Sequence, residues 1–429
     1  MLYATRQLVL SVGFFLADGV MTFRARNTLA AAVICLIALV ANASEPAGRG
    51  FWDGREVLLS ASPVAPKVRI GIWDSGVDTA LFVGRIAQNE SGQDLIRGYD
   101  AFKLRQDTPT AKLPASVSVW QDELNRVLQA FDDIDSNVDS PQARALTRRL
   151  KQQSPEEQAL FDEAVQRWTG YSHGTAVADI ALAGLEQAEI VIARMEWWHG
   201  SPPVPCWTRE LADREAASIG DQLKFLVENK ARVINMSWGR AEGAYLGNLE
   251  KCAPDTPIEE RSALARYTVD TIRTALRDGM AAAPDVLFVG ASGNAGTTVR
   301  AANPATRFSL PNFLLVGAVD RNGAATDWSN AGPEVTLYAN GDRVPARLPG
   351  GALSYPSGTS MATPVIVNAA AKMLFVNPRL SGAQMRSLLE ETADLNATGQ
   401  PLLHTRRAVE AARKLATPSE RQPSPESGQ

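Results

Sequence analysis

The sequence predicts an α/β fold in which helices cover both faces of a mainly parallel central sheet. Short apolar runs typical of buried strands alternate with helical patterns along most of the 429 residues. Alternation of strand, helix and strand favours right-handed crossovers and parallel pairing. The chain is 45% hydrophobic and 21% charged, as folded globular proteins are. At roughly 100–200 residues per domain, the length allows one large domain or two to three ordinary ones.

The expected strands are short, and each is followed by a turn or a helical pattern. They cover residues 68–73, 190–195, 232–236, 286–289 and 314–319. The expected helices cover residues 176–183, 210–229, 267–279 and 365–375. Residues 101–168 interrupt the alternation. Apolar side chains at helical spacing and a capping box at Ser154 to Glu157 predict a polar, helical insertion there, on the rim of the sheet.

The N-terminal region has the pattern of a secretory signal. Arg24 and Arg26 precede an apolar stretch at residues 29–40, and small residues at 41–43 favour cleavage after Ala43. Met21 is a plausible true start. A membrane anchor is the alternative, although the apolar stretch is shorter than the ~20 residues that span a bilayer. We therefore expect a signal peptide at 1–43, a short lead at 44–66, one large domain at 67–416 and a disordered tail at 417–429.

Charge and rare residues exclude several classes of protein. A formal net charge of −4 argues against a generally basic nucleic-acid binder. Three Cys and three His are too few for zinc fingers, a four-thiolate cluster or a disulfide-dense scaffold. Cys35 lies inside the signal, so an exported chain keeps Cys206 and Cys252, which we expect to form one disulfide. Two buried free thiols are the alternative.

Four short windows carry residues suited to acyl-transfer chemistry. Asp74 ends the first strand, His173 heads the helical run 176–183, Asn294 follows the strand 286–289, and Ser360 opens the helix 365–375. A serine hydroxyl needs a neighbouring base, and a histidine base needs an acceptor that fixes its tautomer. An asparagine amide can donate to the oxygen that becomes negative during acyl transfer. Each window alone is weak, but the order Asp, His, Ser is that of subtilisin.

The sequence resembles the subtilisin-like serine protease family over residues 68–415. The Gly-Thr-Ser-Met-Ala-Thr-Pro window around Ser360 is its most specific match, and the segments at 233–239, 316–320 and 327–330 add to it. The resemblance implies a catalytic triad of Asp74, His173 and Ser360, with Asn294 in the oxyanion hole. It also implies that an extended peptide pairs with two segments, whose residues are Ser237, Trp238, Gly239, Ala291, Ser292 and Gly293. Core packing is an equal alternative for Trp238.

The resemblance also indicates the substrates, the oligomeric state, the cofactors and the location of the protein. We expect an exported serine endopeptidase, periplasmic or released, that acts as a monomer on peptide or protein substrates and needs no cofactor. Calcium is unsupported, because residues 80–83 stand where relatives place a calcium-binding Asp. The acidic segment 133–139 lacks the Gly and Glu of a calcium loop and is interpreted as a solvated turn. His199 and His404 have no partner pattern.

Two other functions are compatible with the same sequence. One is a non-catalytic binding protein of the same fold, which would normally have lost a triad residue; none is lost here. The other is a maturation protease with one partner substrate, which the long insertion makes credible.

Overall fold

The computed structural model describes residues 50–59, 67–118, 120–135, 138–196, 205–299 and 308–416. The expected signal peptide, the tail at 417–429, His199 and most of the lead lie outside the described residues.

A nine-stranded sheet forms the centre of the molecule, in the order β10-β11-β7-β6-β5-β4-β1-β3-β2. Every neighbouring pair is parallel except β10 with β11. The prediction of a mainly parallel sheet is therefore confirmed. The strands are β1 (Val68–Asp74), β2 (Ile96–Tyr99), β3 (Ala188–Met195), β4 (Val233–Met236), β5 (Leu287–Ala291), β6 (Phe313–Val319), β7 (Leu337–Asn340), β10 (Asp394–Leu395) and β11 (Pro401–Leu402). Strands β8 (Ala346–Arg347) and β9 (Leu353–Ser354) form a separate hairpin.

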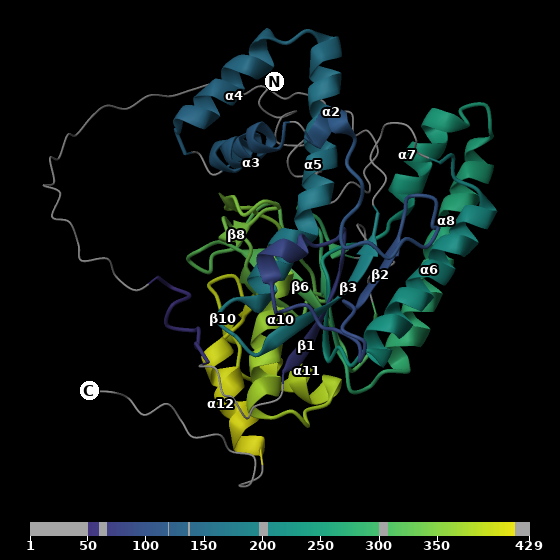
Figure 1. The fold of residues 1–429 in the computed structure, drawn as a ribbon. Coiled ribbons are helices and arrows are strands. Elements are labelled where there is room, and N and C mark those ends of the chain that lie inside the picture. The colour runs from purple at the N-terminus through teal and green to yellow at the C-terminus, as the bar shows by residue number, and fades with distance from the viewer. Residues whose placement is uncertain are drawn as a thin grey trace, which may run out of the picture.

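Helices cover both faces of this sheet (Figure 1). One face carries α5 (Pro155–Leu182), α10 (Thr359–Val376), α11 (Gly382–Glu391) and α12 (Thr405–Leu415). The other carries α6 (Arg209–Glu228), α7 (Glu242–Cys252) and α8 (Ile258–Ala281). Along β1, Ile70 and Ile72 pack into the first layer and Trp73 into the second. Burying both strand faces is what makes these strands read as continuous apolar runs.

Helix α10 runs through the core. Within the described part of the chain it is the helix long and apolar enough to cross a membrane, and 94% of it is buried inside the protein. This helix carries Ser360 in its first turn, so the core itself fixes the position of that residue.

The insertion forms a small helical unit with its own apolar cluster. It contains α2 (Ala115–Ser118), α3 (Gln121–Asp135), α4 (Pro141–Gln152) and the first half of α5. Leu124, Phe131, Leu146 and Trp168 lie at its centre, and Trp168 Nε1 donates to Asn125 Oδ1 at 2.8 Å. The unit stands above the sheet and the β8–β9 hairpin in Figure 1.

The expectation that His173 heads a new helix was wrong. Helix α5 runs without interruption from Pro155, in the insertion, to Leu182, in the core, and His173 lies within it. Gly170 and Gly174 suggest a break, because glycine is a poor helix former. Packing of Trp168 on one side and of Ala176 and Val177 on the other outweighs that preference.

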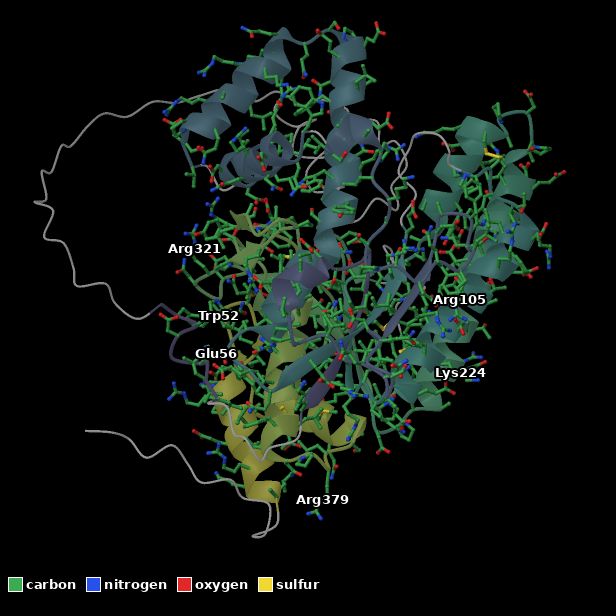
Figure 2. The ribbon with its side chains drawn as sticks, in the orientation of Figure 1. Trp52, Glu56, Arg105, Lys224, Arg321 and Arg379 are labelled. Carbon is green, nitrogen blue, oxygen red and sulfur yellow. A yellow bond between two sulfur atoms is a disulfide. The ribbon has the colours of Figure 1, made fainter. Side chains whose placement is uncertain are left out.

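The described residues of the lead, 50–59, pack against the large domain. Figure 2 shows Trp52 and Glu56 near the C-terminal part of the chain. Trp52 Nε1 donates to the Asp320 carbonyl at 3.3 Å. Glu56 Oε1 lies 2.8 Å from Nζ of Lys372, which is 1% exposed on α10. A buried ammonium needs a counter-charge, and Glu56 supplies it to Lys372. The segment that carries Glu56 is therefore part of the folded domain.

Candidate active site

Asp74 lies at the carboxyl end of β1, the third strand from the β2 edge of the sheet. Its side chain is fully buried, and Oδ1 accepts a hydrogen bond from His173 Nδ1 at 2.8 Å. The same oxygen accepts from the Ser75 backbone N–H at 2.7 Å. A carboxylate held in this way fixes the histidine tautomer that carries its proton on Nδ1, which leaves Nε2 as the basic nitrogen.

The helix that carries His173 lies unusually close to the end of β1. The Gly174 N–H donates to Ser75 Oγ at 3.1 Å, and the Asp78 N–H donates to Thr175 Oγ1 at 3.0 Å. A Cβ atom on Gly174 would lie 2.2 Å from the Gly76 carbonyl oxygen. The glycine next to His173 is therefore required for this close approach.

Ser360 is held by the strand next to β1. Its Oγ donates to the Ser237 carbonyl at 3.3 Å, and Ser237 Oγ donates to the Ser360 carbonyl at 2.8 Å. That carbonyl is available because Pro364, four residues later in α10, has no N–H to donate to it. The proline of the motif thus leaves the Ser360 carbonyl open to Ser237, the residue that follows β4, and this bond anchors the serine.

The sheet register brings the two anchoring points together. Ile72 of β1 pairs with Asn235 of β4, so Asp74 and Ser237, two residues further along each strand, lie level. Neighbouring strands are about 4.8 Å apart. The structure therefore places His173, bonded to Asp74, and Ser360, bonded to Ser237, at the ends of adjacent strands. Both are buried, at 6% and 1% exposure.

Asn294 lies next to the start of α10. Its Oδ1 accepts from the Thr359 N–H and from Thr359 Oγ1, both at 2.8 Å. These bonds turn the amide nitrogen Nδ2 toward Gly358, where a Cβ would stand 3.3 Å from it. Ser360 is the second residue of α10, so its N–H belongs to the first turn, where N–H groups have no intrahelical acceptor. Asn294 Nδ2 and the Ser360 N–H are thus two donors at the start of α10.

The supporting residues Thr359 and Asn330 were not predicted individually. Thr359 Oγ1 accepts from the Gly293 N–H at 3.1 Å. Asn330 Oδ1 accepts from the N–H groups of Ala295 and Thr297, at 3.0 and 3.1 Å. Both residues stand inside windows that the resemblance marks, and this was the only available signal for them.

The two segments expected to bind substrate present backbone rather than side chains. Ser237, Ala291 and Ser292 are fully buried, and Ser292 Oγ donates to the Asn330 carbonyl at 3.1 Å. Trp238 is 3% exposed and packs edge-on against Trp73, with ring centroids 5.0 Å apart. This position corresponds to the core-packing alternative. An extended peptide could still pair with the backbone of residues 237–239.

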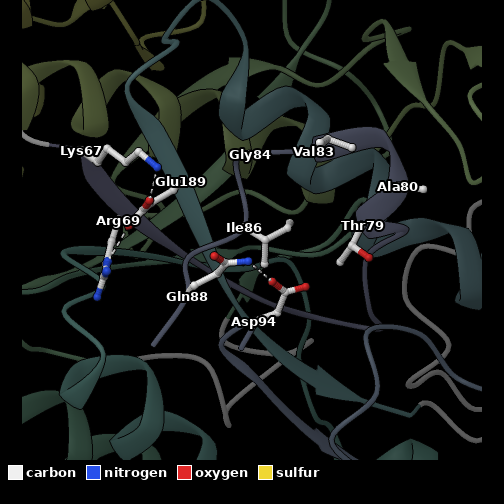
Figure 3. Close-up of a pocket in the computed structure, with 10 residues that line it drawn as sticks. All are labelled: Lys67, Arg69, Thr79, Ala80, Val83, Gly84, Ile86, Gln88, Asp94 and Glu189. Atoms are coloured by element: carbon white, nitrogen blue, oxygen red, sulfur yellow. Dashed lines mark hydrogen bonds and ion pairs between the residues drawn. The ribbon is translucent and has the colours of Figure 1, made fainter. Parts of the chain in front are cut away.

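One hollow among the described residues lies away from these side chains. A cavity of about 590 Å³ opens near the amino end of β1, at the opposite end of that strand from Asp74, and Lys67, Arg69 and Glu189 line it (Figure 3). Lys67 and Arg69 form ion pairs with Glu189 at 2.9 and 2.7 Å. Charged groups that already satisfy one another do not indicate a ligand.

The described residues hold no group of three or more side chains suited to bind a metal ion. At the acidic segment 133–139, Asp133 is 2% exposed rather than solvated. Its two oxygens contact Arg343 Nη1 and Gln142 Nε2, each at 3.0 Å. The interpretation of Asp133 as part of a solvated turn was therefore wrong, because Asp133 ties the insertion to the loop between β7 and β8.

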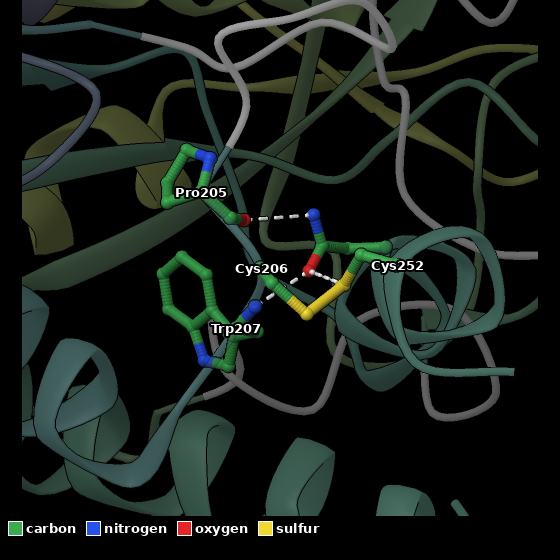
Figure 4. Close-up of a disulfide and its surroundings, with 5 residues drawn as sticks. Pro205, Cys206, Trp207 and Cys252 are labelled. Atoms are coloured by element: carbon green, nitrogen blue, oxygen red, sulfur yellow. Dashed lines mark hydrogen bonds between the residues drawn. A yellow bond between two sulfur atoms is a disulfide. The ribbon is translucent and has the colours of Figure 1, made fainter. Parts of the chain in front are cut away.

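Cys206 and Cys252 form a disulfide that joins the segment before α6 to the end of α7 (Figure 4). Asn248 supports it by accepting from the Trp207 N–H at 2.8 Å and by donating to the Pro205 carbonyl at 3.1 Å. His404 lies apart from the site and caps α12. Burial lowers the pKa of His404, helped by Arg407 and Arg55.

Comparison with known protein families shows which family the chain belongs to. The model of the subtilase family matches residues 66–415. The chain therefore belongs to the subtilase family of serine proteases, as its motifs predicted.

Among characterised relatives, subtilisin amylosacchariticus of Bacillus subtilis subsp. amylosacchariticus is 27% identical, and subtilisin E of Bacillus subtilis (strain 168) is 28% identical. Both matches cover 61% of this chain and 59% of the relative, so the chain spans about three fifths of the length of these relatives. A solved structure of a cold adapted subtilisin-like serine proteinase aligns over 82% of this chain and 94% of its own, at 19% identity and a TM-score of 0.44.

Proposed function

We propose that the protein is an exported serine endopeptidase. The observation that carries the proposal is the hydrogen bond from buried His173 to Asp74, with Ser360 anchored at the end of the neighbouring strand. Ser360 Oγ attacks the carbonyl carbon of the peptide bond while His173 Nε2 takes its proton. His173 then gives that proton to the departing amine, which leaves an ester between the substrate and Ser360. Water, activated by the same histidine, hydrolyses the ester and regenerates the serine.

Asp74 and Asn294 stabilise the charges that form during these steps. Asp74 orients the ring of His173 and stabilises its protonated form, without itself taking up the proton. Asn294 Nδ2 and the Ser360 N–H donate to the oxygen of the tetrahedral intermediate. Because these donors are fixed by Thr359 and by helix α10, little reorganisation is needed when the charge develops.

Export is supported by the signal-like pattern at residues 21–44 and by the disulfide, since disulfides persist mainly in oxidising compartments. The segments 237–239 and 291–293 are the proposed walls of the peptide-binding cleft. A narrow maturation protease uses the same chemistry. A proteome-wide cleavage-site profile separates the two, because a maturation protease yields one dominant site.

The direct test uses purified mature protein and a fluorophosphonate probe, which reacts with activated serines. We expect labelling at Ser360, cleavage of an unfolded protein, and loss of both in Ser360→Ala. Absence of labelling and cleavage in the unmodified protein, with Ser360→Ala behaving identically, contradicts the proposal and favours a binding protein of the same fold.

A further inference from the structure

A buried cluster of charged side chains lies directly behind the segment 237–239. Glu215, on α6, is 1% exposed and accepts from Arg240 Nε at 2.9 Å and from Tyr245 Oη at 3.0 Å. Lys103 Nζ stands 3.5 Å from the same carboxylate. Arg240 and Lys103 are each only 7% exposed. The cluster joins the first turn of the insertion, two helices and the residue that follows Gly239.

The electrostatics of this cluster show that its members depend on one another. Burial acts to raise the pKa of Glu215, but Lys103 and Arg240 outweigh it, so this pKa is lowered. Burial lowers the pKa of Lys103, an effect that Glu215 opposes. Lys103 also adopts a positive φ of 62°, which is unfavourable for a residue with a side chain. The fold keeps this strained turn, and the turn directs the ammonium toward Glu215.

Arg240 connects the cluster to the peptide-binding segment. Its Nη1 donates to the Gly239 carbonyl at 3.0 Å while Nε holds Glu215, so one planar guanidinium fixes both groups. Its Nη2 reaches Met195 Sδ, at the end of β3, at 3.4 Å. The carbonyl of Gly239 is thereby held in one orientation by a group that is itself immobilised.

From these contacts we infer that Arg240 and Glu215 are positioning residues that shape the segment 237–239 for peptide binding, although neither would touch the substrate. The inference rests on the proposed function. Ser237 adjoins Ser360, and a strand rises about 3.3 Å per residue. An extended course through residues 237–239, which follow β4, puts Gly239 up to about 6.6 Å further along, where we expect it to meet a substrate residue about two positions from the bond that breaks. The two residues should thus affect long peptides and leave short ones unchanged.

The test is Arg240→Lys, which keeps the positive charge beside Glu215 but cannot bond Glu215 and the Gly239 carbonyl together. Two fluorogenic substrates are compared: a long peptide with four residues before the cleaved bond, and a short one with a single residue there. We expect KM for the long peptide to rise about tenfold, as for loss of one charge-assisted hydrogen bond. The kcat for the long peptide, both kinetic constants for the short peptide and the rate of fluorophosphonate labelling should stay within about twofold of the unmodified protein.

Glu215→Gln is the second variant, and it should raise KM for the long peptide in the same way. Arg277→Lys is the matched control, because Arg277 is exposed on α8 and pairs with its neighbour Asp278. An unchanged KM for the long peptide in Arg240→Lys overturns the inference. Equal losses for both substrates and for labelling also overturn it, since they indicate a general structural role. If the unmodified protein is not labelled at all, the proposed function has failed instead.

Discussion

The glycine that follows His173 offers a sharp test of how the site is built. In Gly174→Ala, the added methyl group would stand 2.2 Å from the Gly76 carbonyl oxygen and 3.1 Å from the Asp74 Cβ. Ordinary contacts begin near 3.4 Å, so α5 and the end of β1 must separate by about 1 Å. The hydrogen bond between His173 and Asp74, now 2.8 Å, lies across this contact and would lengthen with it.

The expected loss of activity follows from that displacement. A misplacement of about 1 Å at a catalytic centre costs on the order of 100-fold in rate. Overpacking of the same contact costs about 1–3 kcal/mol of stability. We therefore expect kcat to fall about 100-fold while the protein still folds, because the strain is confined to one contact between α5 and β1.

The assay is peptide hydrolysis at saturating substrate, together with denaturant unfolding of the same preparations. Gly220→Ala is the matched control, since Gly220 lies within α6 and a Cβ there meets nothing within 4 Å. That control should be as active as the unmodified protein and up to about 1 kcal/mol more stable. If Gly174→Ala retains full kcat, the close approach of α5 to β1 does not position His173, and the reasoning is wrong.

Three further changes have defined outcomes. Asn294→Ala should lower kcat by about 10²–10³ with little change in KM, a magnitude known from the same donor in subtilisin; an equal rise in KM contradicts an oxyanion role. The Cys206–Cys252 disulfide closes a loop of 46 residues. Its removal should lower the unfolding free energy by about 4 kcal/mol by the loop-entropy relation. Identical denaturation midpoints with and without reductant contradict this prediction. Asp133→Ala removes the buried carboxylate that pairs with the partly buried Arg343 guanidinium and should cost about 3 kcal/mol. Thermal unfolding measures this loss against an exposed control, Asp139→Ala.

The sequence predicted five strands of the sheet, β1, β3, β4, β5 and β6, but not β2, β7, β10 or β11. It also marked the windows that hold Asp74, His173, Asn294 and Ser360. Strands such as β1 and β6 are short apolar runs, and their burial on both faces is visible in the sequence itself. The residues that bear the chemistry stand in turns and helix starts whose local patterns are distinctive. Both kinds of signal are local, and local signals can be read without knowing the fold.

Features that depend on distant contacts could not be predicted. Helix α5 continues through Gly170 and Gly174 because the insertion and the core pack on its two halves. Lys103, Glu215 and Arg240 are far apart in the chain and look like surface residues until the fold brings them together. Trp238 was open to two interpretations because its environment depends on Trp73, in another strand.

The central claim is that His173 and Ser360 of the proposed triad work as one unit, and a kinetic cycle tests it most directly. The kcat values for peptide hydrolysis are measured in Ser360→Ala, in His173→Ala and in the double variant. If the two residues act in one proton transfer, each single change should abolish nearly all the rate, and the double change should cost no more than either, as in subtilisin. Losses that multiply, or a His173→Ala variant that keeps its activity, would contradict the triad.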